Sequence, residues 1–144
     1  AVYPIFDKAL SEDHEILPID IYGLSKSLGE INNDKNLTLR TSIIGPELKD
    51  DGEGLFSWFI KQKGEVNGFT ESIWGGVTTL VLADVIIKSI NENYKGLFHV
   101  TNRQPISKFD LLKNIADIYG LDIRIEKELE EKGRALIERI NKLG

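Results

Sequence analysis

The stretch DIYGLSKSLGE, residues 20–30, predicts a helix that carries a tyrosine and a lysine one turn apart. Asp20 is a favourable N-cap residue because its side chain can accept a hydrogen bond from the first amide groups of a helix. We expect this helix to run from residue 20 to about residue 33. Tyr22 and Lys26 are four residues apart, so they share one face of the helix and their polar ends can converge.

A paired phenol and ammonium are the groups needed for proton transfer coupled to hydride transfer. A free tyrosine titrates near 10, and a neighbouring ammonium favours the phenolate form. Lowering a phenol pKa by about 2 takes roughly 2.7 kcal/mol, which an ammonium and an oxidised nicotinamide ring could supply together. The ammonium also has three donors for ribose hydroxyls. Taken alone, the spacing is equally compatible with an interfacial tyrosine beside a solvated lysine.

The hydrophobic periodicity beyond this helix alternates between two and 3.6, which predicts strands alternating with helices. NLTLRTSIIG predicts a buried strand over 36–45, because it is apolar and β-branched and ends at a Gly-Pro pair. Ser107 and Asp110 have the spacing of a capping box at the start of a helix over 106–120, with aspartate in place of glutamate. Further helices are expected over 54–64 and 79–94, and further strands over 65–70, 95–102 and 121–126. The fold class is therefore α/β.

Apolar stripes at helical spacing occur in two further segments. In the helix over 79–94 the stripe consists of Leu82, Val85, Ile86 and Ile90. In the charged tail over 127–144 it consists of Leu129, Leu136, Ile140 and Leu143. The apolar stripes of these two segments predict helices that bury one face.

At the N-terminal end of the chain, residues 1–6 are expected to form the end of a strand.

The composition excludes several classes of function. The 144 residues carry a formal net charge of −5, which argues against binding to a phosphate backbone as the main role. No apolar run approaches the roughly 20 residues that span a bilayer, and there is no signal-peptide pattern. Cysteine is absent and the only histidines are His14 and His99, which argues against disulfides and against a zinc site. A cytoplasmic setting fits these features.

The stretch YGLSKSLGE, followed by LTLRTSIIGPE, resembles the second half of an extended short-chain dehydrogenase/reductase. Within that superfamily it is most similar to the dTDP-4-dehydrorhamnose reductase and sugar-nucleotide epimerase branch. Later segments of that branch are similar, in the same order, to GLFSWFIKQKGEVNGFTESIWGGVTTLVLADVI, KGLFHVTNRQPISKFDLLKNIADIYG and GRALIERINKLG. The resemblance implies the C-terminal part of a Rossmann-like doubly wound parallel sheet and a small substrate-binding region. We expect one partial domain, with residues 1–50 ending the Rossmann-like part and 51–144 forming mostly the substrate-binding region.

The resemblance also implies roles for individual residues. Tyr22 matches the catalytic acid/base of the family and Lys26 its partner lysine, and both would contact the cofactor. The next candidates for cofactor contacts, at the end of the expected strand, are Thr41, Ser42 and Ile43; a buried strand and its exit turn explain these residues equally well. The implied activity is reduction of a 4-keto sugar nucleotide with NADP or NAD as cofactor, without a metal, in polysaccharide biosynthesis. An epimerase or dehydratase of the same superfamily, or a non-catalytic binding or regulatory member, remains an alternative.

The aromatic residues and histidines have plainer explanations beside the functional one. The side chains that could line a sugar pocket are Trp58, Phe69 and Trp74, although aromatics spaced in this way are more often part of a core. His99 lies in an apolar strand and is expected to be a hydrogen-bonded core histidine. His14 lies in an acidic loop and is expected to be solvated.

Two parts of the family pattern are absent from these 144 residues. No G-x-x-G-x-x-G or G-x-G-x-x-G turn occurs, although the family binds its dinucleotide with one. The family's catalytic serine or threonine precedes a valine–tyrosine pair, which is Val2-Tyr3 here, so it would fall before Ala1. We therefore expect the C-terminal half of a reductase-like protein, trimmed at both ends, whose parent protein binds a nucleotide sugar and forms a homodimer. Alone, the chain is expected to expose strand edges and an apolar face, and to be inactive.

Overall fold

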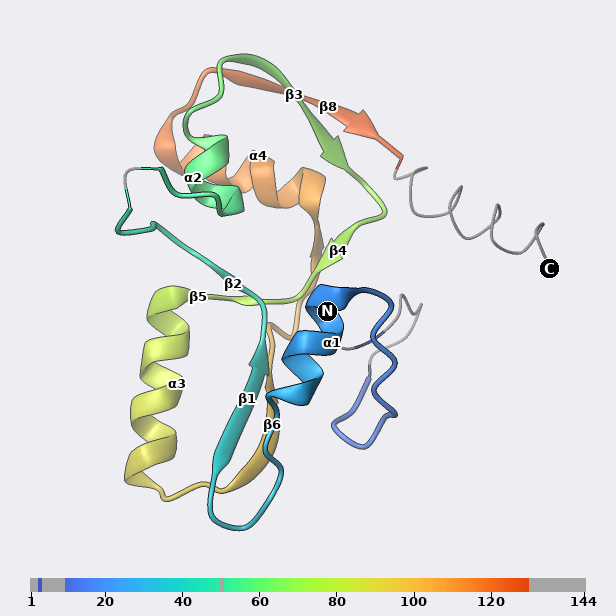
Figure 1. Cartoon of the computed structure of the whole chain (residues 1–144). Coiled ribbons are helices and arrows are strands. Elements are labelled where there is room, and N and C mark those ends of the chain that lie inside the picture. The colour runs from blue at the N-terminus through green and yellow to red at the C-terminus, as the bar shows by residue number, and fades with distance from the viewer. Residues whose placement is uncertain (1–2, 4–9, 50, 130–144) are drawn as a thin grey trace, which may run out of the picture. The chain divides into compact units, whose positions relative to one another are not determined.

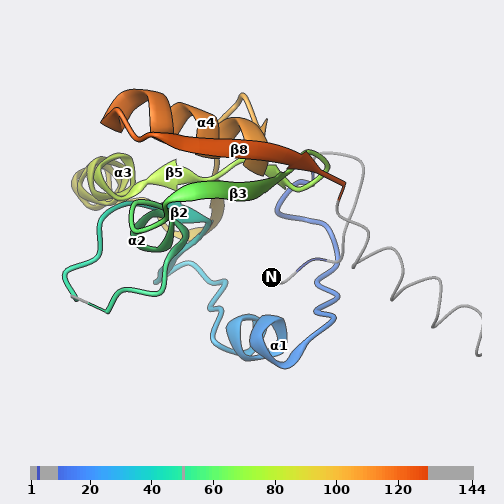
Figure 2. The same ribbon diagram turned by 90° about the horizontal axis from the view of Figure 1, so that it is seen from above.

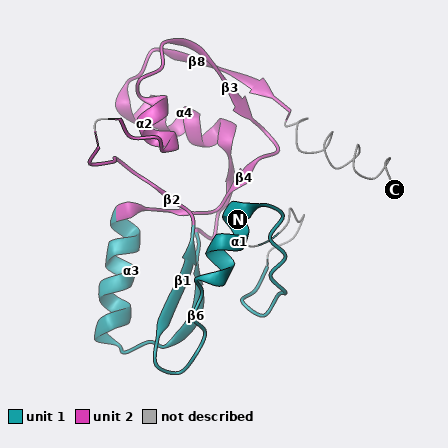
Figure 3. Cartoon of the chain, viewed as in Figure 1, with its two compact units in different colours: residues 1–41, 80–101 teal, residues 42–79, 102–144 magenta. Residues whose placement is uncertain are grey.

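The computed structural model describes residue 3, residues 10–49 and residues 51–129. The expected strand end in 1–6, apart from Tyr3, and most of the apolar stripe of the tail lie outside these residues. The chain divides into two compact units, Ala1–Thr41 with Leu80–Thr101 and Ser42–Thr79 with Asn102–Gly144 (Figure 3). Each unit is therefore built from two separate segments of the chain.

The first unit contains a parallel pair of strands, β1 (Leu37–Thr41) and β6 (Gly96–Val100) (Figure 1). The register places Leu37 opposite Gly96 and Thr41 opposite Val100. Parallel neighbours need a long crossover, and the segment between these strands includes the helix α3 (Thr79–Asn91), which belongs to this unit from Leu80 onward. The helix α1 (Ile21–Leu28) precedes β1.

The helix α1 begins as predicted and ends earlier than predicted. The Asp20 carboxylate accepts a hydrogen bond of 2.6 Å from the amide of Gly23, which confirms the N-cap. The helix stops at Leu28 with Gly29 as its C-cap, rather than running to residue 33. Two residues later, the backbone of Ile31 bonds to the hydroxyl of a threonine on β1, and this alternative partner replaces the helical hydrogen bond.

The described residues of the second unit form three pairs of short strands and two helices. The parallel pairs are β2 (Ile43–Ile44) with β5 (Val77–Thr78), and β3 (Gly64–Phe69) with β8 (Ile123–Glu128). The antiparallel pair is β4 (Ile73–Trp74) with β7 (Ile106–Ser107), and the helices are α2 (Leu55–Phe59) and α4 (Lys108–Tyr119). Figure 2 shows β3 and β8 side by side, with α4 next to β8. The predicted α/β class with parallel strands is confirmed.

The buried core of the second unit forms where α4 and α2 pack against β3. Phe59 is fully buried, and the residues of this core are Phe56, Phe59, Val66, Leu111, Leu112, Ile115 and Ala116. Ser107 is confirmed as the N-cap of α4, because its hydroxyl accepts a hydrogen bond of 3.0 Å from the amide of Asp110; the Asp110 carboxylate accepts from that hydroxyl at 2.6 Å instead of from the Ser107 amide that a capping box uses. Gly120 ends the helix in the left-handed region at φ 61°, which glycine adopts at little cost.

The strand predicted over 36–45 is two strands in the structure, and Ser42 separates them. Before this residue, β1 pairs with β6; after it, β2 pairs with β5. The Ser42 carbonyl accepts a hydrogen bond of 2.9 Å from the amide of Val77. A Cβ atom on Gly76 would lie 2.1 Å from the same carbonyl oxygen, so this approach of the two backbones requires glycine. The change of partner strand is the reason that one apolar stretch became two elements.

The apolar stripes of α1 and α3 are largely exposed. On α3, Leu82 and Val85 are half-buried as predicted, whereas Ile86 and Ile90 are exposed. On α1, Ile21 is 86% exposed, and Gly23 is its one buried residue. An exposed apolar face was expected for a chain that carries part of a larger fold. None of the helices that the structure describes has the length and apolar character needed to cross a membrane.

Candidate active site

The structure brings Tyr22 and Lys26 together on α1. The Lys26 ammonium nitrogen lies over the Tyr22 ring, 5.1 Å from its centroid, in a cation–π contact. The Tyr22 side chain is 62% exposed, so a ligand in solution can approach it. The pair thus has the proximity predicted from its spacing, with the ammonium against the face of the ring.

The other polar side chains of this helix bond to the helix itself. The Ser25 hydroxyl donates a hydrogen bond of 2.8 Å to the carbonyl of Tyr22. The Ser27 hydroxyl donates a bond of the same length to the carbonyl of Leu24. Serines in helices commonly bond to a carbonyl of the preceding turn. The hydroxyls of both serines thus donate within the helix, whereas the Lys26 ammonium contacts the Tyr22 ring.

The three predicted cofactor contacts follow one another at the end of β1. Thr41 is the last residue of β1 and belongs to the first unit, as Tyr22 and Lys26 do. Ser42 and Ile43 begin the second unit. The Ser42 hydroxyl accepts a hydrogen bond of 3.0 Å from the indole nitrogen of Trp74. The structure therefore pairs Tyr22 with Lys26, and Ser42 with an aromatic residue that is a candidate for a sugar pocket.

The remaining aromatic and histidine candidates have ordinary environments. Trp74 and Phe69 are half-buried, and Trp74 packs against the core of the second unit, whereas Trp58 is exposed. The His99 ring is half-buried with Nε2 3.2 Å from the hydroxyl of Tyr3, which confirms a hydrogen-bonded histidine. His14 is exposed, and its Nδ1 accepts a hydrogen bond of 3.0 Å from the Ser11 amide.

Arg40 is a structurally prominent residue that sequence reasoning missed. Its Nε and Nη2 donate to the two carboxylate oxygens of Glu30 at 2.8 and 2.7 Å, and its Nη1 donates to the Tyr3 hydroxyl. The hydrogen bond from Arg40 to Glu30 raises the pKa of the guanidinium further, and burial raises the pKa of the Tyr3 phenol. A charged residue inside the apolar stretch LTLRTSIIG was the available signal, since buried charges are normally paired.

The candidate cofactor residues and the N-termini of α1 and α2 differ in the groups that they could offer a dinucleotide. The Lys26 ammonium has donors that suit ribose hydroxyls, and Thr41, the last residue of β1, carries a hydroxyl in the same unit. A pyrophosphate needs a helix N-terminus with available amides. The N-terminus of α1 is instead capped by the Asp20 carboxylate, and that of α2 by the Glu47 carboxylate, which accepts a 2.7 Å bond from the Gly54 amide. These carboxylates would repel an anionic ligand at those two positions.

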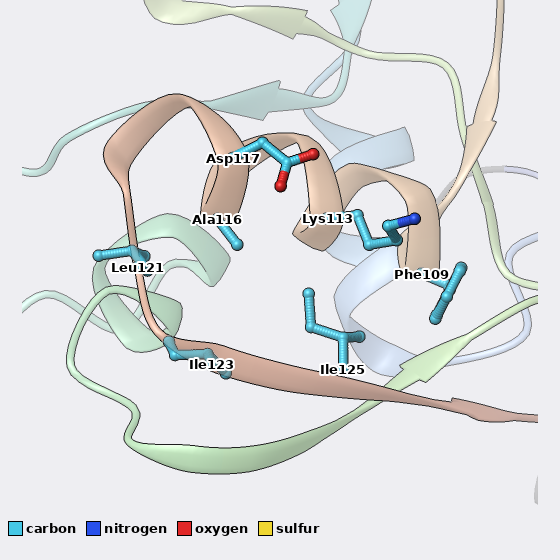
Figure 4. Close-up of a pocket in the computed structure, with 7 residues that line it drawn as sticks. All are labelled: Phe109, Lys113, Ala116, Asp117, Leu121, Ile123 and Ile125. Carbon is cyan, nitrogen blue, oxygen red and sulfur yellow. The ribbon is translucent and has the colours of Figure 1, made fainter.

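Two further features of the described residues bear on ligand binding. They contain no cluster of three acidic or histidine side chains that could hold a metal ion. A shallow cavity of about 260 Å³ lies between α4 and β8, lined by Phe109, Lys113, Leu121 and Ile125 among others (Figure 4). None of the predicted site residues lines it. Its volume falls below the usual range of small-molecule sites.

The fold of the chain matches part of solved dTDP-4-dehydrorhamnose reductases. No protein-family model and no curated protein matches the chain by sequence. Solved structures do match. A dTDP-4-dehydrorhamnose reductase from Bacillus anthracis, in complex with NADP, is 27% identical over 84% of this chain and 45% of that chain, with a TM-score of 0.72.

Two further reductases give the same result. A hypothetical dTDP-4-dehydrorhamnose reductase from Sulfolobus tokodaii is 26% identical over 88% of this chain and 46% of its own, with a TM-score of 0.72. A dTDP-4-dehydrorhamnose reductase from Clostridium acetobutylicum is 24% identical over 88% of this chain and 46% of its own, with a TM-score of 0.71. At that identity, the match shows the likeness of the fold alone. The resemblance drawn from the sequence is confirmed. The chain spans about half the length of these reductases.

Proposed function

We propose that this chain forms the acid–base and substrate-binding part of a reductase that acts on a 4-keto sugar nucleotide with NADP or NAD. The observation that supports this most is the contact of Tyr22 with Lys26 on α1, within a fold that matches half of a dTDP-4-dehydrorhamnose reductase. The Bacillus anthracis protein was found in complex with NADP. Neither a metal nor a cysteine is needed for this reaction.

In the proposed reaction Tyr22 supplies a proton and Lys26 assists it. A bound nicotinamide would supply hydride to the carbonyl carbon of the sugar. The Tyr22 hydroxyl gives its proton to the carbonyl oxygen, so that the product is an alcohol. The phenolate that remains takes a proton from solvent. The Lys26 ammonium stabilises that phenolate through its positive charge and can hold ribose hydroxyls with its donors. The exposure of the Tyr22 side chain leaves its hydroxyl accessible to such a substrate.

A fusion protein tests the proposal directly. The part of the Bacillus anthracis reductase that this chain does not cover, joined to residues 1–144, should oxidise NADPH in the presence of a dTDP-4-keto-6-deoxy sugar. Tyr22→Phe should lower kcat at least about 100-fold, since general acid catalysis contributes that much. Tyr94→Phe, at an exposed tyrosine outside the proposed site, is the matched control and should leave the rate unchanged.

The same fusion protein separates the alternatives. A folded fusion that binds NADPH without reducing the keto sugar, and that instead epimerises a 4-hydroxy nucleotide sugar, would replace the reductase proposal by an epimerase. Equal rates for the wild type and Tyr22→Phe would remove Tyr22 from the mechanism. Circular dichroism of each variant shows whether the fusion is folded before its rates are compared.

A further inference from the structure

The helix that carries Tyr22 and Lys26 has little apolar packing to hold it. It is eight residues long, and a helix of that length is marginal in water without tertiary contacts. Gly23 is its one buried residue, whereas Ile21 and Leu28 are strongly exposed. Its attachment to the rest of the first unit must therefore depend on other interactions.

Two residues just beyond the C-cap of the helix, Glu30 and Ile31, form hydrogen bonds with side chains of β1. The Glu30 carboxylate accepts two hydrogen bonds from the Arg40 guanidinium, in the side-by-side geometry that only arginine provides. The next residue, Ile31, exchanges hydrogen bonds with the Thr38 hydroxyl, which accepts from the Ile31 amide at 3.3 Å and donates to its carbonyl at 2.6 Å. Thr38 and Arg40 are two apart on a strand, so both side chains project from one face.

The ion pair is shielded from water and is tied to further segments. The side chains of Arg40 and Glu30 are only 11% and 13% exposed. The guanidinium also donates to the Tyr3 hydroxyl and lies 3.3 Å from Nε2 of His99 on β6. An ion pair with so little exposure is costly to break, because the remaining partner is left as an uncompensated charge.

We propose that Arg40, Glu30 and Thr38 are positioning residues for the Tyr22–Lys26 pair. Glu30 closely follows α1, and Arg40 directly precedes Thr41. The ion pair therefore joins the helix that carries the acid–base pair to the end of β1, where a candidate cofactor contact lies. The role in catalysis rests on the proposed function; the anchoring of α1 does not. The three residues touch no reacting atom and act through the orientation of the helix.

Hydrogen exchange of the full chain, followed by mass spectrometry, measures the anchoring without any activity. Arg40→Lys keeps the charge and loses the paired donors, and Thr38→Val keeps the shape and loses the hydroxyl. Each should speed exchange of the α1 amides at least about tenfold while the β3 amides stay unchanged. Arg124→Lys is the matched control. Arg124 forms an ion pair with Glu65 on a neighbouring strand of the second unit, so this change should leave the exchange of the α1 amides unchanged.

A charge-exchanged double variant and the fusion protein complete the test. Glu30→Arg combined with Arg40→Glu should restore much of the slow exchange that either single change loses. In an active fusion, Arg40→Lys should lower kcat more than about tenfold and change KM less than about threefold. Unchanged α1 exchange in both Arg40→Lys and Thr38→Val overturns the proposal, and so does an unchanged kcat in an active fusion. An inactive fusion with faster α1 exchange in the variants refutes the reductase and upholds the anchoring.

Discussion

At the scale of single residues, two hydrogen bonds hold Ser42, and a glycine makes room for one of them. Its hydroxyl accepts from the Trp74 indole, its carbonyl accepts from the Val77 amide, and the absence of a side chain on Gly76 allows that approach. The neighbouring Gly75 lies in a looser place, where an added Cβ would meet Pro105 at 3.5 Å. An alanine side chain would therefore overlap its surroundings at position 76 and fit at position 75.

Replacing Gly76 by alanine should destabilise the protein, whereas the same change at Gly75 should not. The new Cβ on Gly76 would overlap the Ser42 carbonyl, and overpacking of this kind costs about 1–3 kcal/mol. Gly75→Ala should change the free energy of unfolding by less than about 0.5 kcal/mol, as ordinary van der Waals contact requires no shift. Urea unfolding of both variants measures the difference. Equal stability of the two variants would show that the backbones around Ser42 separate easily.

Glu47 gives a prediction about pH. The Gly54 amide and the Ser57 hydroxyl donate to its carboxylate and hold the pKa of this carboxyl below its ordinary value of 4.5. Because the pKa of Glu47 is lower in the folded chain than in the unfolded chain, its carboxylate stabilises the fold above about pH 4.5. This stabilisation is lost as the pH falls through the pKa of the folded chain. Glu47→Gln should be less stable than the wild type at pH 7, and the gap should close in acid.

Urea unfolding at pH 7, 5, 4 and 3 follows this gap. Glu15→Gln removes an exposed glutamate of the first unit and serves as the control, with a stability curve parallel to that of the wild type. A gap between Glu47→Gln and the wild type that stayed constant from pH 7 to 3 would show that the carboxylate does not cap α2.

At the scale of elements, the helices differ in how far each is stabilised locally. The α4 helix has a side-chain cap at Ser107, a left-handed glycine at its end and four buried residues. The α1 helix has a side-chain cap at Asp20 but buries only a glycine. Packing therefore stabilises α4, whereas α1 depends on its cap and on the polar anchors directly after it.

Removing the cap of α4 should cost about 1 kcal/mol of unfolding free energy, as N-cap serines typically contribute. Ser107→Ala leaves the Asp110 amide without its side-chain acceptor. Ser27→Ala removes a hydroxyl that bonds to a carbonyl within its own helix, and it should be close to neutral. Thermal unfolding of the two alanine variants compares them; a larger loss for Ser27→Ala would contradict the assignment of the cap.

Local sequence signals predicted the starts of helices and missed the choice of strand partners. Asp20 and the Ser107–Asp110 pair were readable because a cap involves residues three apart. The break at Ser42 depends on strands that lie more than thirty residues further along the chain, and no local pattern carries that information. The early end of α1 depends on Thr38 of β1, seven residues beyond Ile31, and the apolar periodicity of the sequence does not indicate that bond.

The candidate site was predictable to a similar extent. The Tyr22–Lys26 contact follows from helical spacing alone, because both residues lie within one element. The ion pair of Arg40 with Glu30 joins two elements, so the sequence showed only that an apolar strand contained a charge. The catalytic and cofactor-binding roles of these residues, including Thr41, Ser42 and Ile43, stay predictions.

At the scale of the whole molecule, burial is unevenly distributed between the two units. The described core residues cluster in the second unit around Phe59. In the first unit, Val100 is the one buried apolar residue among those described, whereas exposed apolar side chains occur along α1 and α3. Among the described residues, the second unit therefore has much more apolar burial than the first.

The chain alone should not bind NADPH. The described N-termini of α1 and α2 are capped by carboxylates, and the sequence has no glycine-rich turn for a pyrophosphate. Titration with NADPH should therefore give no saturable change in the fluorescence of Trp58 and Trp74, and the chain should not reduce a dTDP-4-keto sugar. The fusion with the Bacillus anthracis segment is the positive control. Saturable binding by residues 1–144 would show that a different surface holds the dinucleotide.

The interleaving of the two units has a consequence for synthesis on the ribosome. Leu37 pairs with Gly96, and Gly64 pairs with Ile123, so both sets of partners are 59 residues apart in sequence (96 minus 37, 123 minus 64). At about 5–20 residues per second, β1 waits roughly 3 to 12 s before its partner has been made. Neither parallel pair can form earlier, and the unpaired strand edges are open to aggregation during that interval. A chaperone that binds extended apolar segments would have its largest effect on yield within this window.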